Sequence, residues 1–347
     1  MGETGALHGS QITIFRVLFS VFVILNILGN SLVIITIICS RLLKTPMHYL
    51  LLNLSIAYII VAIFYIPRYV IYDQRVYPDN KMAADFMCKF LTEASLSWVG
   101  LQASVFTLVT IAFERYFVIV HPRIALGRFT KATLIRVIVA CWVYSFLLTM
   151  AEFIYYSYDK KKNRCVFTWS EQVREANAYL WSFTCGIVPI LAMGLLYGRI
   201  LRDIHVRWKT ETAVSRRALL RSRRRMTKTV IILALVYTIF WLPNLVVWIL
   251  GPGYKAYGIL LACTHMCLLL SGCTIPFVYI LQDEQFQLGL QDLCSSHSNN
   301  RVQDSTRVAE DKQTNEEDTN DEMMKKVRFA APFVLVPRLE MEQLNQS

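Results

Sequence analysis

The sequence predicts an all-α membrane protein: a seven-transmembrane helix bundle, followed by a short amphipathic eighth helix and a disordered C-terminal tail. The 347-residue chain is 55% hydrophobic, only 18% charged and positive in mean hydropathy, unlike a soluble domain. It contains seven long uncharged stretches, and about 20 apolar residues of helix cross the hydrocarbon layer of a bilayer. Lys and Arg residues are also distributed unevenly between alternate loops.

The uncharged stretches give the predicted spans, which are 17–39, 49–67, 94–113, 137–151, 176–198, 229–254 and 256–282. No small-residue cleavage pattern follows the first span, so we interpret it as a membrane anchor and not as a signal peptide. The fourth span has only fifteen residues. It becomes long enough if Arg136 and Glu152 extend toward the two surfaces and residues 154–156 continue the helix.

Positive charge predicts the orientation of the bundle. The loops 40–48, 116–136 and 199–228 together carry 17 Lys and Arg residues, whereas the alternate segments carry 11. Cytoplasmic loops are enriched in these residues, so the N-terminus is predicted to face outward and the C-terminus inward. The basic run 216–225 is equally consistent with a simple contact with anionic membrane lipids. The chain then divides into an extracellular N-terminus (1–12), the seven-helix domain (13–282), the amphipathic helix (283–294) and a cytoplasmic tail (295–347).

Seven spans with an outward N-terminus leave a receptor, a light-driven pump and a transporter open. We see no internal repeat, which disfavours a transporter, and almost no ionisable residue in mid-span, which disfavours an ion pathway. No hydrolase, metalloprotease or phosphate-loop motif occurs, so no enzyme activity and no cofactor are predicted. A nucleic-acid partner does not suit a seven-span protein. Cys263, His265 and Cys267 are too close together for one metal site on a helix face, and no metal is predicted.

Short motifs in successive spans carry a family resemblance. They are "LGN" (28–30), "NLSIA" (53–57), "CK" (88–89), "ASVFTLVTIAFERY" (103–116), Trp142, Pro189 with Tyr197, "FWLP" (240–243) and "IPFVY" (275–279). In this order they resemble the landmarks of a rhodopsin-like (class A) G-protein-coupled receptor, over about residues 10–293. The run 103–116 is also similar to that of neuropeptide FF, tachykinin and galanin-type receptors.

The resemblance implies an activation switch. In that family an arginine at the cytosolic end of the third helix pairs with its acidic neighbour at rest and moves beneath the G protein on activation. A kinked Trp-x-Pro segment acts as the pivot of the sixth helix. The matching positions here are Glu114, Arg115, Tyr116, Tyr197, Trp241, Pro243, Pro276 and Tyr279. Taken singly, each residue is also consistent with ordinary packing or with a snorkelling helix end.

The resemblance also implies a disulfide between Cys88 and Cys165, both in outward-facing segments. Cys88 lies 27 residues before Arg115, about two more than in the family, which implies a longer or locally irregular start of the third helix. Segment 283–294 resembles the eighth helix, with Cys294 as a candidate for palmitoylation or an unmodified thiol. Ser and Thr residues in the polar tail suit receptor kinases and arrestin, although a purely solvated tail has the same composition.

The N-terminal segment is too short for a ligand-binding domain, so the ligand is expected to enter the bundle from outside. Carry-over from the family places the pocket at Ser97, Trp98, Leu101, Asn244, Leu245, Trp248, His265 and Leu269, each of which is also consistent with a core position. Leu269 stands where opsins have their retinal lysine, and Ser97 stands where amine receptors have their aspartate.

A peptide ligand therefore remains, and strand-like residues around Cys165 in segment 158–172 resemble the hairpin of neuropeptide receptors. The charge of the peptide stays open. Glu93 and Glu152 suit a basic peptide, whereas the lysines 160–162 suit an acidic one.

Several positions depart from the family pattern. Tyr58 and Ile275 replace the aspartate and asparagine of the allosteric sodium site, so agonist affinity is expected to be insensitive to sodium beyond ionic strength. A sodium-specific shift, which lithium or choline does not reproduce, would contradict this expectation. Arg223 stands where some receptors have a glutamate that pairs with the switch arginine, which predicts raised basal activity. Arg123 replaces an apolar residue that contacts the G protein.

The sequence thus predicts a receptor in the plasma membrane that binds an extracellular neuropeptide and activates a heterotrimeric G protein. Arrestin, receptor kinases and membrane lipids are further expected partners. Two alternatives stay open, namely a receptor-derived decoy or scaffold that does not signal, and a receptor for a non-peptide small molecule.

Overall fold

The computed structural model describes residues 9–71, 77–92, 95–168, 170–210, 214–250 and 257–299. Seven helical segments in these ranges are long and apolar enough to cross a membrane. The elements are α1 (Gly9–Cys39), η1 (Arg41–Leu43), α2 (Pro46–Ile66), η2 (Pro67–Ile71), α3 (Lys81–Phe86), η3 (Met87–Thr92), α4 (Ser95–Val120), α5 (Pro122–Arg128), α6 (Lys131–Tyr155), β1 (Tyr156–Asp159), β2 (Arg164–Phe167), α7 (Glu171–Ser182), η4 (Phe183–Ile187), α8 (Val188–Thr210), α9 (Val214–Leu250), α10 (Tyr257–Gln282) and α11 (Glu284–Asn299). The predicted seven-helix bundle is confirmed.

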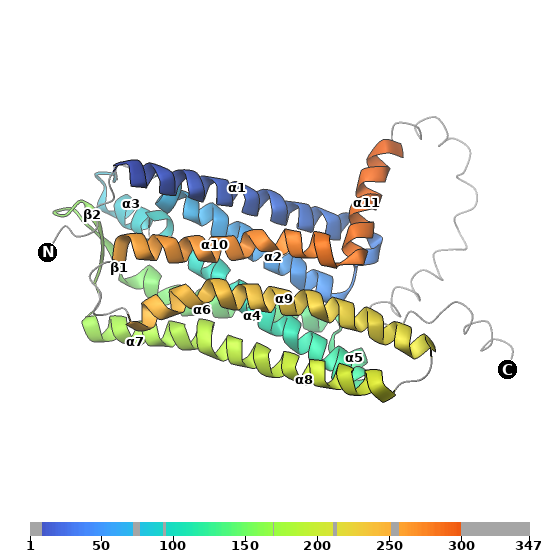
Figure 1. The fold of residues 1–347 in the computed structure, drawn as a ribbon. Helices are drawn as coiled ribbons and strands as arrows, with labels where there is room; N and C mark the ends of the chain where they lie inside the picture. The colour runs from blue at the N-terminus through green and yellow to red at the C-terminus, as the bar shows by residue number, and fades with distance from the viewer. Residues whose placement is uncertain are drawn as a thin grey trace.

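The spanning helices lie side by side and close on themselves (Figure 1). Helix α1 packs against α2, α2 against α4, α4 against α6 and α8, and α9 against α10. The last span, α10, returns to α1, and a Cβ atom at Gly29 would lie only 2.7 Å from Cγ of Pro276. The hairpin β1–β2 lies at one end of the bundle, and α11 turns away from the bundle axis at the other (Figure 1).

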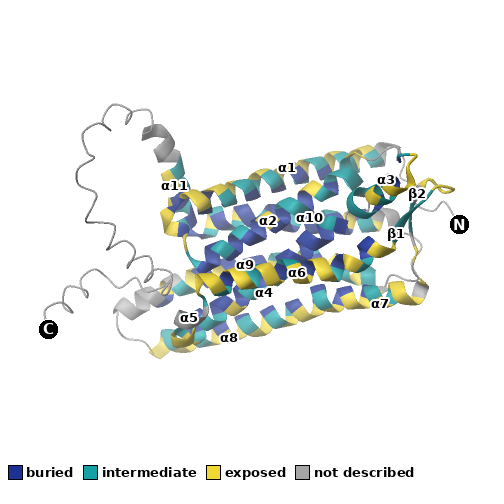
Figure 2. Ribbon diagram, turned by 180° about the vertical axis from the view of Figure 1, so that it is seen from behind, coloured by how far each residue is buried: buried dark blue, intermediate teal, exposed yellow. Residues whose placement is uncertain are grey.

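Burial follows the pattern expected in lipid. Buried residues face the interior of the bundle, and exposed residues lie on the outward faces of the helices (Figure 2). Many of the exposed residues are large and apolar, such as Leu28 (65% exposed), Leu195 (72%) and Leu281 (70%). Such a surface would be unfavourable in water but suits the hydrocarbon layer.

The fourth span is longer than its uncharged stretch, as predicted. It begins after Thr130, whose Oγ1 accepts a hydrogen bond from the Thr133 N–H at 3.3 Å. It ends at Tyr155, and Tyr156 belongs to strand β1 instead of the helix. Glu152 also differs from the expectation, because its side chain is buried and does not extend to the surface.

The start of the third span is irregular, as the long spacing between Cys88 and Arg115 implied. Segment η3 is a π-helix, in which each turn holds about one residue more than in an α-helix. Two further π-helical segments, η2 and η4, lie in the second and fifth spans and were not predicted.

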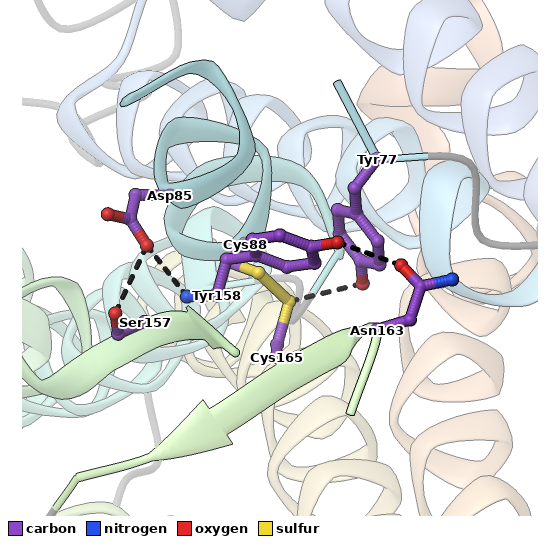
Figure 3. The surroundings of a disulfide bond; sticks show 7 residues. All are labelled: Tyr77, Asp85, Cys88, Ser157, Tyr158, Asn163 and Cys165. Atoms are coloured by element: carbon purple, nitrogen blue, oxygen red, sulfur yellow. Dashed lines mark hydrogen bonds between the residues drawn. A yellow bond between two sulfur atoms is a disulfide. The ribbon is translucent and has the colours of Figure 1, made fainter. Parts of the chain in front are cut away.

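The hairpin β1–β2 is fixed to the third span by the disulfide between Cys88 and Cys165, whose Cα atoms are 5.6 Å apart (Figure 3). Its strands are antiparallel, with Tyr156 opposite Phe167. Asp85 accepts hydrogen bonds from Ser157 Oγ at 3.1 Å and from the Tyr158 N–H at 2.7 Å (Figure 3). Both the predicted hairpin and the predicted disulfide are confirmed.

Helix α11 corresponds to the expected eighth helix but continues beyond residue 294 to Asn299. Phe286 is buried against the ring of Tyr279, at a centroid distance of 6.0 Å. The backbone of Cys294 lies in α11, whereas its side chain and the tail from residue 300 fall outside the described part of the chain.

Candidate functional site

Arg115 lies near the C-terminal end of α4 and is almost completely buried. Its side chain is 2% exposed and that of Glu114 is 0% exposed. The guanidinium donates two hydrogen bonds to the neighbouring carboxylate, from Nε to Oε2 and from Nη2 to Oε1 at 2.8 Å. This bidentate pair keeps both charges neutralised in the apolar interior. Tyr116 contacts His121 instead, with 3.3 Å between Oη and Nε2.

Two buried tyrosines gather around this ion pair. Tyr197 from α8 and Tyr279 from α10 both interact electrostatically with Arg115. The Tyr279 hydroxyl has no hydrogen-bond partner within the described residues. His48 from α2 is also buried here, within electrostatic range of Arg115, and was not singled out by the sequence. The structure therefore brings together four of the predicted switch residues, namely Glu114, Arg115, Tyr197 and Tyr279.

The N-terminal part of α9 carries cations toward the same site. Arg223 lies within electrostatic range of Arg115 and Arg207, so like charges face each other. Arg207 is held by Asp203 at 2.8 Å and donates to the Val120 carbonyl at 3.3 Å. One contact between this end of α9 and another element is an ion pair between Arg225 and Glu284 of α11, which the sequence did not reveal.

The expected pivot lies in the middle of α9, which runs continuously through Pro243. Trp241 is buried, and the ring of Tyr237 lies 5.5 Å from it. The Tyr237 hydroxyl donates to the carbonyl of Cys185 in η4. In a regular α-helix this carbonyl would accept from residue 189, but Pro189 has no N–H, so the carbonyl can accept a hydrogen bond from α9 instead.

The centre of the bundle is joined by hydrogen bonds between neutral groups. Tyr58 and Ser271 lie with their oxygens 3.1 Å apart, and Asn30 Nδ2 donates to the carbonyl of Gly272 at 3.1 Å. Ile275 is buried beside this network. Because residue 58 is a tyrosine, this network has no carboxylate at that position. The expected insensitivity to sodium stays a prediction.

A cluster of aromatic rings occupies the half of the bundle nearer the hairpin β1–β2. The Trp98 ring of α4 lies 5.1 Å from Trp181, 6.2 Å from Trp248 and 5.2 Å from His265. His265 in turn stacks on Tyr65 at 5.7 Å and forms a hydrogen bond with Tyr69 through Nδ1. We call these six residues the Trp98 cluster.

The predicted pocket residues separate into two groups. Trp98, Trp248 and His265 meet in the cluster, whereas Ser97 donates to the Val61 carbonyl at 3.4 Å and so faces α2. Leu101, Leu269 and Asn244 are buried, and Leu245 packs where a Cβ atom at Gly186 would lie.

Tyr65, Tyr69 and Trp181 belong to the cluster but were not among the predicted residues. The spacing of Tyr65 and Tyr69 could have indicated the two tyrosines, because residues four apart share one helix face.

Comparison with known proteins agrees with the fold described above. The family model described as "7 transmembrane receptor (rhodopsin family)" matches residues 29–279, well over half of the chain. Galanin receptor 2a of Danio rerio is 26% identical over 316 residues, which cover 87% of this chain and 83% of that protein. Galanin receptor type 1 of Homo sapiens is 26% identical over 317 residues (85% and 86%). A QRFP-like peptide receptor of Branchiostoma floridae is 22% identical over 292 residues (79% and 76%).

Proposed function

The chain belongs to the rhodopsin family of seven-transmembrane receptors, and from this premise we propose that it is a peptide-activated receptor for heterotrimeric G proteins. It is a multi-pass membrane protein, and receptors of this family are not enzymes. We place it in the plasma membrane with its N-terminus outside. An epitope tag at the N-terminus is expected to be accessible to antibody on intact cells, whereas a tag at residue 347 is not.

A peptide ligand is supported by the relatives and by the entrance to the bundle. The relatives named above are receptors for galanin and for a QRFP-like peptide. The disulfide holds the hairpin β1–β2 at the extracellular end, beside a cluster that provides large aromatic surface for a bound side chain. A non-peptide ligand would use the same aromatic surface, and it is the alternative outcome of the ligand screen below.

The observation that carries the proposal is the buried pair of Arg115 and Glu114. A buried charge that loses its partner is strongly unfavourable, so Arg115 can leave Glu114 only if another partner replaces it. The hydroxyls of Tyr197 and Tyr279 are the nearby groups with which it would next interact, together with backbone carbonyls of a docked G protein. A ligand then activates the receptor by binding the rearranged state more tightly.

The decisive experiment is nucleotide exchange on a G protein in membranes that contain the receptor, stimulated by a library of neuropeptides. Arg115→Ala is expected to abolish exchange while surface expression is retained. Arg136→Ala is the matched control, because Arg136 lies on the exposed face of α6 and, within the described residues, bonds to Ala132 and Thr133 of its own helix. Full activity of the Arg115→Ala receptor would contradict the proposal.

A second candidate function is a non-signalling decoy or scaffold. The observation in its favour is the hydrogen bond between Tyr58 and Ser271, which ties α2 to α10 across the centre of the bundle. This second function would be supported by a wild-type protein that binds peptide but does not stimulate nucleotide exchange, so that Arg115→Ala changes nothing.

For the cytoplasmic side, we propose that the tail is phosphorylated by receptor kinases and captured by arrestin, and that Cys294 is palmitoylated. The basic run 216–225 is proposed to contact anionic lipids.

A further inference from the structure

We propose that the Trp98 cluster binds a carboxylate of the ligand, either a free C-terminus or an acidic side chain. This inference rests on the proposed function, because it names the chemical class of ligand for that same receptor. It also settles the charge of the ligand, which the sequence left open between basic and acidic peptides.

Three polar groups of the cluster, the Tyr65 hydroxyl, Trp181 Nε1 and His265 Nε2, have no hydrogen-bond partner within the described residues, and the proposal rests on the last two. The Trp181 and His265 side chains are only 7% and 4% exposed. Both rings pack against the same ring, Trp98. A buried polar group without a partner costs about 1–3 kcal/mol, and more in surroundings that exclude water. A ligand that brings a hydrogen-bond acceptor into the cluster would therefore be bound favourably.

A chain of hydrogen bonds is consistent with His265 Nε2 as a donor. Arg68 Nε donates to the Tyr69 hydroxyl oxygen at 3.1 Å, and the Tyr69 O–H can donate to His265 Nδ1. A neutral imidazole that accepts at Nδ1 carries its proton on Nε2. An anion at Nε2 would thus be connected through His265 and Tyr69 to the guanidinium of Arg68, which lies 5.6 Å from the Tyr69 ring. Such connected bonds strengthen one another around a charge.

Three carboxylates of the described residues near this end of the bundle already have partners. Asp85 accepts from Ser157 and Tyr158, and Asp159 accepts from the N–H of Lys161 at 2.9 Å. Glu152 on α6 also has interactions of its own. None of the six cluster residues is acidic. The cluster itself therefore offers donors and no negative charge.

The hairpin tip adds positive charge above the cluster. The ammonium groups of Lys160, Lys161 and Lys162 are exposed at the turn, where Asn163 adopts a φ of 45°. Exposed cations at an entrance raise the local concentration of anionic ligands and the rate of their association.

A cationic ligand is the main competing interpretation, because aromatic rings also attract cations. It would leave Trp181 Nε1 and His265 Nε2 without an acceptor. A carboxylate offers acceptor oxygens to such donors. The arrangement of polar atoms therefore favours an anion.

The test uses the purified full-length protein and two probes of nearly equal shape, phenylacetate and phenylacetamide. Binding is followed by the melting temperature at increasing probe concentration. Hydrogen bonds to charged groups are stronger than those to neutral ones, so phenylacetate is expected to bind about tenfold more tightly than phenylacetamide. Trp181→Phe and His265→Phe, which keep a ring but remove the donor, are expected to abolish this preference.

Trp208→Phe is the matched control, because Trp208 lies near the cytosolic end of α8 and contacts Arg224. It is expected to keep the preference for the acid. If a cluster variant does not fold, quenching of tryptophan fluorescence by 4-nitrophenylacetate and by its amide makes the same comparison in the wild-type protein.

Equal binding of acid and amide, binding of neither probe, or a preference that survives in both cluster variants would overturn the proposal. Binding of neither probe would mean that water alone satisfies the donors. A preference that survives in both cluster variants would mean that the acid binds elsewhere. The readout needs no G protein, so a loss of signalling does not affect it. A receptor that signals in response to peptides but shows no preference for the acid would keep the proposed function and refute this inference.

Discussion

At the scale of single residues, Gly272 determines how closely α10 can approach α2. A Cβ atom at this position would lie 2.5 Å from Cδ1 and 2.9 Å from Cγ of the Tyr58 ring. Both atoms belong to a rigid buried ring, whose hydroxyl is held by Ser271 at 3.1 Å. The ring has no room to move, so the absence of a side chain at residue 272 is what admits a tyrosine to the centre of the bundle.

We therefore predict that Gly272→Ala lowers the free energy of unfolding by about 1–3 kcal/mol, the usual cost of one extra methyl group in a packed core. The matched control is Gly194→Ala in α8, where a Cβ atom would meet nothing within 4 Å. Alanine is the better helix former, so the control is expected to be neutral or slightly stabilising. Melting of the two purified variants decides the point, and equal melting temperatures would contradict it.

At the scale of elements, the junction of α10 and α11 depends on Asp283. Its Oδ1 accepts hydrogen bonds from the N–H groups of Gln285 at 2.9 Å and Phe286 at 3.1 Å, which caps α11. Burial raises the pKa of the Asp283 carboxyl above its usual range, although these two hydrogen bonds and the charges of Arg115 and Arg225 oppose the shift. The folded protein thus binds a proton here more readily than the unfolded chain does.

The sign of the pH dependence follows from this shift. The contribution of Asp283 to stability is fully present below the unfolded pKa, near 3.9, and is lost as the pH rises through the higher folded pKa. Asp283→Asn keeps the acceptor but cannot ionise, so it is expected to be at least as stable as the wild type at neutral pH. Asp283→Ala removes the cap and is expected to cost about 1 kcal/mol. Amide hydrogen exchange at residues 285 and 286 measures both effects, and faster exchange in Asp283→Asn would contradict the assignment.

A second contact of α11, the ion pair between Arg225 and Glu284, joins it to the N-terminal part of α9. We predict that Arg225→Glu raises nucleotide exchange without ligand by a few-fold, and that the double charge swap Arg225→Glu with Glu284→Arg restores it. The effect is small because the two side chains are 46% and 61% exposed, and such pairs contribute about 0.2–1 kcal/mol. A double variant as active as the single one would show that the pair does not restrain α9.

At the scale of the whole molecule, the disulfide between Cys88 and Cys165 closes a loop with a sequence separation of 77. This loop contains the third and fourth spans, so its closure restricts the unfolded chain over a large part of the bundle. The chain-entropy estimate for such a loop is about 4 kcal/mol. The double variant Cys88→Ser with Cys165→Ser is expected to melt at a clearly lower temperature. The control is Cys263→Ser, which removes an exposed free thiol. Equal melting of the two variants would contradict the expectation.

Much of this architecture could be predicted from the sequence, because lipid forces every backbone polar group in a span to bond within its own helix. Apolar stretches of sufficient length therefore had to be helices. The ends of the spans could not be placed as well, as Glu152 and Tyr156 illustrate, because charged and aromatic residues occur on both sides of a helix end. The irregular start of the third span could be predicted because the spacing between Cys88 and Arg115 is about two residues longer than in the family.

The candidate site was predictable where its partners are close in sequence. Arg115 and Glu114 are adjacent, and their pairing needed no knowledge of the fold. The contacts of Trp98 with Trp181 and of Arg225 with Glu284 join different spans or helices, so their geometry depends on helix packing. The π-helical turn η4 adds to this difficulty, because it rotates all later side chains of the fifth span relative to a regular helix.

The close contact between α1 and α10, at Gly29 and Pro276, has a consequence for biosynthesis. The ribosome makes the first span long before the seventh, so the flank of α1 that contacts α10 is covered only by lipid until the seventh span is inserted. The ring of helices closes when the final span arrives, and a chain truncated before residue 257 would leave that flank permanently open to quality-control factors.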